Sequence, residues 1–281
     1  MSPLILAAVQ PVAQRGDRER ENVAEALRYI DEAAAAGARL VMFPEGFPGP
    51  YYGELTYDPG DEISERAKAR GVFVVYSRLE HGAAADARYY LTLRLVDPRG
   101  EILGTYRRVQ VTPPHVNEVL FGKDLVAGDE DDLVVYETEI GNIGLLICSE
   151  VYSPELARVL TLKGADILLY PVGGLIYELM DTWQTMVWAR AIENLVYVAS
   201  TQNIYGCEDG MGMIAGPETV LARSKQPGLL LAQVDIDRLH ELRGLDQRLD
   251  LPMPYRVIPG LIRWRRPELY GQLSQAGQPV A

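Results

Sequence analysis

Short apolar runs alternate with longer amphipathic stretches along most of the chain. Runs of about four to eight apolar residues closed by polar or turn residues predict buried strands, and residues 4–9 form one. Apolar residues then recur at helical spacing between positions 18 and 36, and a second apolar run covers residues 40–45. A strand, a helix and a strand in this order predict a parallel pair with a right-handed crossover. We expect Asp17 to cap the helix and Gly37 to end it.

The rest of the chain continues this alternation and adds hairpins. Turn residues at 97–100 separate two strand-like segments, 89–96 and 101–111, and a second hairpin surrounds residues 140–142. Because such pairs are antiparallel, we expect a mixed sheet. Residues 112–128, with two prolines and two glycines, predict a long loop that includes at most a short turn of helix, and loops of this length are usually functional. Further helices are expected at 61–71, 155–164 and 182–194, and further strands at 72–76, 166–170, 195–200 and within 213–235.

Composition favours one soluble globular domain. The chain has 281 residues, 48% of them hydrophobic and 23% charged, which is enough for one large core. The net charge of -12 argues against nucleic acid or anionic membrane as partners, because their phosphates would be repelled. Cys148 and Cys207 are too few for a disulfide scaffold and fit a cytoplasmic location. The run at 4–9 is too short to span a membrane and has no basic region before it, so we expect neither a signal peptide nor a transmembrane segment.

One apolar run ends in a cysteine at position 148. Glu150 follows two residues later, and Pro154 opens a segment with the composition of a helix start. We therefore expect the Cys148 thiol at a strand-to-helix turn, where backbone N–H groups lower a thiol pKa and can bind an oxyanion. A buried, unreactive cysteine is the alternative that this stretch leaves open. Glu45, which closes an earlier strand, would lie at the sheet edge where α/β proteins bind ligands.

No metal or other cofactor is expected from the sequence. The chain has three histidines, too few for a histidine-based metal site, and shows no zinc-ligand spacing or glycine-rich phosphate loop. Cys207 stands beside Glu208 and Asp209, whose charges would raise its thiol pKa, so we do not expect it to be a nucleophile.

Three stretches occur in an order and spacing that resembles the nitrilase, or carbon-nitrogen hydrolase, superfamily. They are Phe-Pro-Glu at 43–45, Tyr-Arg-Arg-Val at 106–109 and Ile-Cys-Ser-Glu at 147–150. Segments 163–167, 190–194 and 265–270 support the resemblance, which covers most of the chain. It implies a single domain over residues 1–281, a four-layer αββα sandwich with mixed central sheets, no cofactor, a small-molecule substrate and a homodimer or larger homo-oligomer.

The C-terminal part of the chain, residues 238–281, is predicted to be a tail. It is polar and carries Arg263, Arg265 and Arg266, which contrast with the acidic rest of the protein. We expect this tail to pack on a neighbouring subunit.

The resemblance also implies catalytic roles for four residues. Glu45 matches the general base, Cys148 the nucleophile, and Glu118 a second glutamate that orients the base or the substrate. Arg108 stands at the position of the catalytic lysine, where it keeps a positive charge but replaces an ammonium by a planar guanidinium. A covalent route needs a thiol activated by a nearby base, and a buried carboxylate with a raised pKa can serve both thiol and water. The substrate pocket is expected to include Tyr51, Ser149, Glu150 and Tyr152.

The leading hypothesis is a hydrolase that cleaves a C–N bond of a small amide, carbamoyl compound or nitrile, with amide favoured. Arg108 replaces the lysine, and Ser149 stands where a larger residue commonly follows the cysteine. These two departures from the family pattern keep two alternatives open. One is a degenerate protein of this fold with a binding or scaffolding role. The other is an altered reaction, such as hydration, transfer or lyase chemistry, on a carboxylate-bearing substrate held by Arg108. Lys123 is the other lysine of this region and reads as part of an exposed turn.

Overall fold

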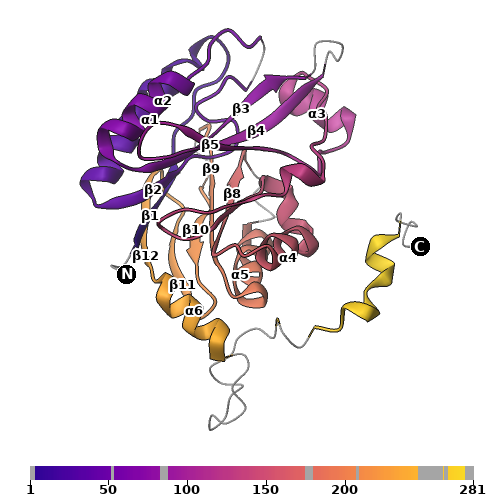
Figure 1. Cartoon of the computed structure of the whole chain (residues 1–281). Coiled ribbons are helices and arrows are strands. Elements are labelled where there is room, and N and C mark those ends of the chain that lie inside the picture. Colours follow the sequence, from indigo (N-terminus) through magenta and orange to yellow (C-terminus); the bar gives the residue numbers. More distant parts are fainter. Residues whose placement is uncertain are drawn as a thin grey trace.

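The computed structural model describes residues 4–51, 54–82, 88–174, 180–206, 209–245, 262 and 265–275. Its strands form two six-stranded sheets, which Figure 1 shows between layers of helices. The first sheet contains β12 (Gly228–Val234), β1 (Leu4–Gln10), β2 (Ala38–Met42), β3 (Phe73–His81), β4 (Tyr89–Val96) and β5 (Ile102–Arg107), in that spatial order. The second contains β11 (Val220–Ser224), β10 (Gly212–Ala215), β9 (Tyr197–Gln202), β8 (Ile167–Val172), β7 (Ile143–Leu145) and β6 (Val135–Tyr136).

The two sheets share one pattern of strand directions. In each, three neighbouring strands are parallel, namely β1, β2 and β3 in the first sheet and β7, β8 and β9 in the second. Antiparallel strands flank each parallel group. Both sheets are therefore mixed, as the predicted hairpins require.

The helices cover the outer faces of the sheets. They are α1 (Glu21–Ala35), α2 (Gly60–Arg70), α3 (Pro114–Phe121), α4 (Pro154–Leu162), α5 (Met180–Asn194) and α6 (Ile236–Leu245). Helices α1 and α2 pack on the first sheet, and α5 packs on the second beside α4. The order of layers is thus helix, sheet, sheet, helix, which confirms the predicted αββα sandwich.

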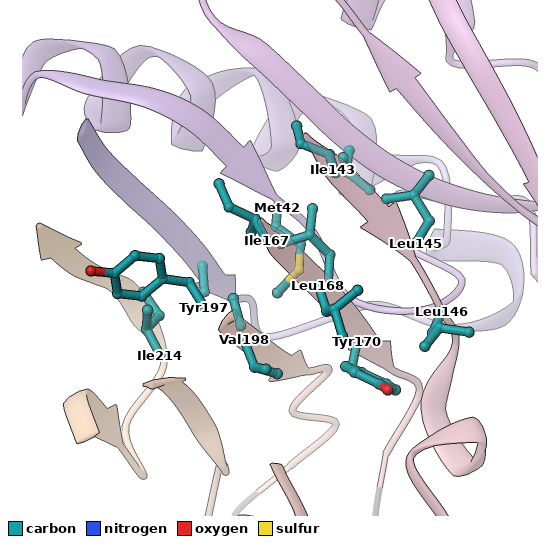
Figure 2. Packing of buried hydrophobic residues seen from close by; sticks show 14 of the residues in the cluster. Met42, Ile143, Leu145, Leu146, Ile167, Leu168, Tyr170, Tyr197, Val198 and Ile214 are labelled. Carbon is teal, nitrogen blue, oxygen red and sulfur yellow. The ribbon is translucent and has the colours of Figure 1, made fainter. Parts of the chain in front are cut away.

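Alternating side chains of the central strands supply two separate cores. In β1, Ala7 belongs to the core beneath α1 and α2, whereas the preceding residue, Leu6, points to the opposite face and belongs to a larger core that lies between the sheets and continues to α4 and α5. This alternation follows from the two-residue period of a strand. Figure 2 shows part of the larger core, where Met42 of β2 lies close to Ile167 of β8. The burial of both strand faces explains why the strands read as continuous apolar runs.

Most predicted elements are confirmed, and three details are wrong. Asp17 does not cap α1: it lies in a separate 3-10 helix, Gly16–Arg18, and α1 begins after Arg20. The strand predicted at 101–111 is shorter, because β5 ends at Arg107. The short helix allowed within 112–128 is α3, which begins at Pro114, whose fixed φ and missing N–H suit the first turn of a helix. Strand β3 continues to His81, past the predicted end at position 76.

The predicted tail begins inside a folded helix. Within α6, the side chains of Leu239 and Leu242 are buried in this chain, 0% and 1% exposed. The described residues 265–275 form short 3-10 helices, Pro267–Leu269 and Gly271–Ser274, set apart from the sheets in Figure 1. Packing of this segment on a neighbouring subunit stays a prediction. Among the helices of the described residues, none has both the length and the apolar character that crossing a membrane requires.

Candidate active site

Several loops meet at one edge of the paired sheets. Glu45 follows β2, Cys148 follows β7 and Gly173 follows β8, so each comes after the carboxyl end of a parallel strand. Arg108 follows β5, which runs in the direction of β3 because both are antiparallel to β4. The strand directions of both sheets therefore bring these four residues to one edge, where α/β sheets bind ligands.

A buried ion pair joins Glu45 and Arg108. Arg108 Nη1 lies 3.3 Å from Glu45 Oε1, and both side chains are almost fully buried, at 2% and 3% exposed. Burial opposes the charge of Arg108, but the Glu45 carboxylate, together with Cys148 and Glu150, outweighs it and raises the pKa of the guanidinium. A fixed positive charge therefore lies beside the thiol and the carboxylate.

The guanidinium of Arg108 is held by two further groups. Its Nε donates to the Gln110 carbonyl oxygen at 2.9 Å, and its Nη2 donates to Ser149 Oγ at 2.5 Å. A short side chain at position 149 thus accepts a hydrogen bond from the long side chain at position 108. With one N–H used on each nitrogen, two of the five N–H groups remain for other partners.

Cys148 begins a 3-10 helix, Cys148–Tyr152, directly after the buried Ile147. Its φ of 49° is in the left-handed region, which is unusual for a residue with a Cβ and is found disproportionately at functional sites. The expected strand-to-helix turn is confirmed. The expected lowering of the thiol pKa is wrong: burial raises it, the Glu45 carboxylate raises it further, and Arg108 opposes both. The thiol is therefore protonated at neutral pH and needs a base to become a nucleophile.

Glu150 joins the loop of Arg108 to the loop of Cys148. Its Oε2 accepts hydrogen bonds from Tyr106 Oη at 2.7 Å and from the Ile147 N–H at 2.6 Å. Its Oε1 accepts from the backbone N–H groups of residues 109 and 110, each at 2.9 Å. The side chain is fully buried, which raises its pKa against the opposing effects of Arg108 and these donors.

These contacts correct the assignment of Glu150 to substrate binding. A carboxylate has about four lone-pair sites, and Glu150 uses all four on donors of its own chain. It holds the two catalytic loops together instead. Helix α5 supports the same region, because Arg190 Nε donates to the Val151 carbonyl oxygen at 3.1 Å.

Gly173 is a site residue that sequence reasoning missed. Its N–H donates to Glu45 Oε2 at 2.7 Å, so the carboxylate is held by Gly173 on one oxygen and by Arg108 on the other. A Cβ at position 173 would lie 3.0 Å from Glu45 Oε2 and 2.8 Å from Tyr51 Oη, which only glycine avoids. The Gly173-Gly174 pair after an apolar strand was a signal for a close backbone approach.

The remaining predicted residues divide between the site and the surface. Tyr51 is buried beside Arg108 and Glu45, at 3% exposed. Tyr152 is 45% exposed, and its ring packs edge-on against Trp183, with centroids 5.9 Å apart. Glu118 has an exposed side chain on α3, and its role in orienting the base or the substrate stays a prediction. Lys123 lies over the ring of Tyr89, 4.1 Å from its centroid, and Cys207 lies outside the described residues.

Comparisons with known proteins agree with this geometry. The carbon-nitrogen hydrolase family model matches residues 5–244. A deaminated glutathione amidase from Synechocystis sp. is 32% identical over 266 residues, covering 86% of this chain and 96% of that protein. Omega-amidase NIT2 from Homo sapiens is 25% identical, covering 86% of this chain and 92% of that protein. A solved carbon-nitrogen hydrolase from Helicobacter pylori G27 has the same fold, with a TM-score of 0.79 and 20% identity over 97% of this chain and 99% of that one. The fold, the edge that gathers Glu45, Arg108 and Cys148, and the match over residues 5–244 together show that this chain belongs to the carbon-nitrogen hydrolase family.

Proposed function

We propose that this protein is an amidase that hydrolyses a small amide through a covalent thioester on Cys148. The observation that carries the proposal is the contact of one carboxylate, Glu45, with both the half-buried Cys148 thiol and the buried cation of Arg108. A base, a nucleophile and a positive charge are the three groups that acyl transfer through a thiol requires. The relatives named above as amidases support the choice of an amide substrate.

In the first step, Sγ of Cys148 attacks the amide carbonyl carbon while Glu45 accepts the thiol proton. The carbonyl oxygen becomes an oxyanion, and the unused N–H groups of Arg108 are donors of the right charge to stabilise it. Glu45 then returns the proton to the departing nitrogen, the C–N bond breaks, and ammonia leaves a thioester behind.

In the second step, Glu45 removes a proton from a water molecule that attacks the thioester carbonyl. The C–S bond breaks, the thiol regains its proton, and the carboxylic acid product leaves. The raised pKa of Cys148 suits this scheme, because the sulfur carries no persistent charge between turnovers and its proton has one nearby acceptor. In a solved structure of a glutamate-to-glutamine mutant of the amidase from Nesterenkonia sp. AN1, 22% identical to this chain, the active-site cysteine carries the acetamide moiety of fluoroacetamide, so the cysteine of that protein is a nucleophile.

The hydrolase fits the contacts of Arg108 better than the two alternatives do. The contacts of the guanidinium with Glu45, Ser149 and a backbone carbonyl fix it beside the thiol, where its two remaining N–H groups can receive the oxyanion that forms when Cys148 attacks. A degenerate site would have no reason to keep a buried ion pair beside a strained cysteine, because such a pair contributes little net stability. A reducing, cytoplasmic location is part of the proposal, since the reaction needs a free thiol.

Ammonia release from a panel of small primary amides and nitriles tests the function. We expect wild type and Cys207→Ala to release ammonia from at least one amide. Cys148→Ala and Glu45→Gln should lose activity by about 10²-fold or more, the loss typical of a missing general base or nucleophile. An active Cys148→Ala protein would contradict the proposal.

A further inference from the structure

The end of β9 crosses from its own sheet to the first sheet. Thr201 Oγ1 donates to the Val9 carbonyl oxygen, and the next residues continue toward the loop that follows β1. There the Ile204 N–H donates to the Pro11 carbonyl oxygen at 2.9 Å, and the Ala13 N–H donates to the Ile204 carbonyl oxygen at 2.8 Å. Backbone bonds therefore fix the segment 201–204 independently of the side chain at position 203.

Asn203 lies within this segment and reaches the loop of Glu45. Its side chain is buried, at 2% exposed. Its Nδ2 donates to the Glu45 carbonyl oxygen at 2.7 Å and to the Gly173 carbonyl oxygen at 3.2 Å. One side-chain amide thus joins the backbone of a first-sheet loop to that of a second-sheet loop.

The same two loops also meet at the carboxylate. Gly173 donates its N–H to Glu45 Oε2 at 2.7 Å, so Glu45 is held at its carbonyl oxygen by Asn203 and at its carboxylate by Gly173. Because Asn203 fixes the Gly173 carbonyl as well, it sets the distance between the Gly173 N–H and the carboxylate. Neither Asn203 nor Gly173 presents its side chain as a reacting group.

We propose that Asn203 is the positioning residue for the general base, locking Glu45 against the Gly173 N–H and beside the Cys148 thiol. The proposal rests on the function proposed above. A carboxylate that drifts by about 1 Å from its productive position costs on the order of 10²-fold in rate. Without the hydrogen bond from Asn203, Glu45 would also make a weaker hydrogen bond with the Cys148 thiol.

Two measurements distinguish a role of Asn203 in positioning Glu45 from a role in the stability of the fold. Both use the Cys207→Ala background, which leaves Cys148 as the one thiol of the chain. The first is kcat and KM on an amide substrate. The second is the pH dependence of Cys148 alkylation by iodoacetamide, which needs no amidase activity. Asn142→Ala is the matched control, because Asn142 Nδ2 also donates to a backbone carbonyl, that of Gly164 at 3.1 Å, at the opposite end of β7.

We expect Asn203→Ala to lower kcat by about 10²-fold with KM close to wild type. Its Cys148 should be alkylated faster at neutral pH, because displacing Glu45 removes one cause of the raised thiol pKa. Asn203→Asp, which keeps the size but lacks both donors, should lower kcat as well. Asn142→Ala should match wild type in kcat and in alkylation.

Three results would overturn the proposal. The first is wild-type kcat and wild-type alkylation in Asn203→Ala, and the second is an equal loss of kcat in Asn142→Ala. The third is failure of both Asn203 variants to fold, since the backbone bonds of segment 201–204 should keep it in place. If alkylation changes as expected but no amide is hydrolysed by wild type, the function proposed above fails while the positioning of Glu45 stands.

Discussion

The two charges beside Cys148 act on its thiol in opposite directions. Burial raises the thiol pKa, Glu45 raises it further and Arg108 lowers it. At neutral pH the thiolate fraction is therefore small. Removing the Glu45 charge should lower the pKa and increase that fraction, whereas removing the Arg108 charge should raise the pKa and reduce it.

We predict opposite changes in alkylation for Glu45→Gln and Arg108→Met. In the Cys207→Ala background, iodoacetamide at pH 7 should modify Cys148 faster than in the parent when Glu45 is Gln, and more slowly when Arg108 is Met. Both variants should nevertheless lose amide turnover, because each removes a group needed for acyl transfer. Alkylation rates of each variant recorded from pH 6 to 10 give the thiol pKa. If the pKa shifted in the same direction in both variants, one of the two charges would not act on the thiol as described.

Residues whose roles depend on a local motif could be predicted from the sequence. Glu45 and Cys148 each close an apolar run, and Arg108 lies near the end of the strand-like segment 101–111, so their meeting at one edge is consistent with the strand order. Gly173 and Asn203 gave no comparable signal, because they act on Glu45 from 128 and 158 positions away through backbone groups. The role of Glu118 stays a prediction, and its side chain is exposed on α3.

At the scale of elements, one carboxylate connects β5 to the 3-10 helix of Cys148. Four donors converge on Glu150, and three of them are backbone N–H groups. Each buried donor left without an acceptor costs about 1–3 kcal/mol. The sequence placed Glu150 correctly beside Cys148, but its inward direction depends on the positive φ at Cys148, which no local pattern encodes.

We predict that Glu150→Ala is strongly destabilised. The loss of the shared acceptor should lower the free energy of unfolding by several kcal/mol, about the cost of two or more unpaired donors. Urea unfolding followed by circular dichroism measures this change. Glu155→Ala, an exposed glutamate in the first turn of α4, is the control and should stay within about 0.5 kcal/mol of wild type. Equal stability of the two variants would refute the role of Glu150 as the joining residue.

At the scale of the whole molecule, the order of the layers could be predicted, but the conformation of the C-terminal tail could not. The apolar runs and hairpin turns indicate a mixed α/β fold, because strands buried on both faces alternate with amphipathic helices. The four-layer order was implied by the resemblance to carbon-nitrogen hydrolases. The tail lacks such a pattern. In the described residues 265–275, Leu269 and Leu273 are each 65% exposed, although both are large apolar side chains.

We predict that this segment packs on a second copy of the chain. Truncation before position 261 should yield a smaller particle in light scattering. Leu269→Asp combined with Leu273→Asp should do the same, because charged side chains are costly to bury in an interface. Val119→Asp is the control, since Val119 is 84% exposed on α3, and it should leave the particle size unchanged. An unchanged size in the truncated protein would exclude the tail as the assembly contact.

The covalent intermediate on Cys148 is the most direct test of the account. Wild-type protein mixed with a turned-over amide and quenched in acid within milliseconds should show, by intact mass spectrometry, a mass increase equal to the acyl group minus one hydrogen. Peptide mapping should place this group on Cys148, and ammonia should appear in an initial burst that matches the amount of enzyme. Amide hydrolysis without any acyl adduct, continuing at the wild-type rate in Cys148→Ala, would contradict the mechanism.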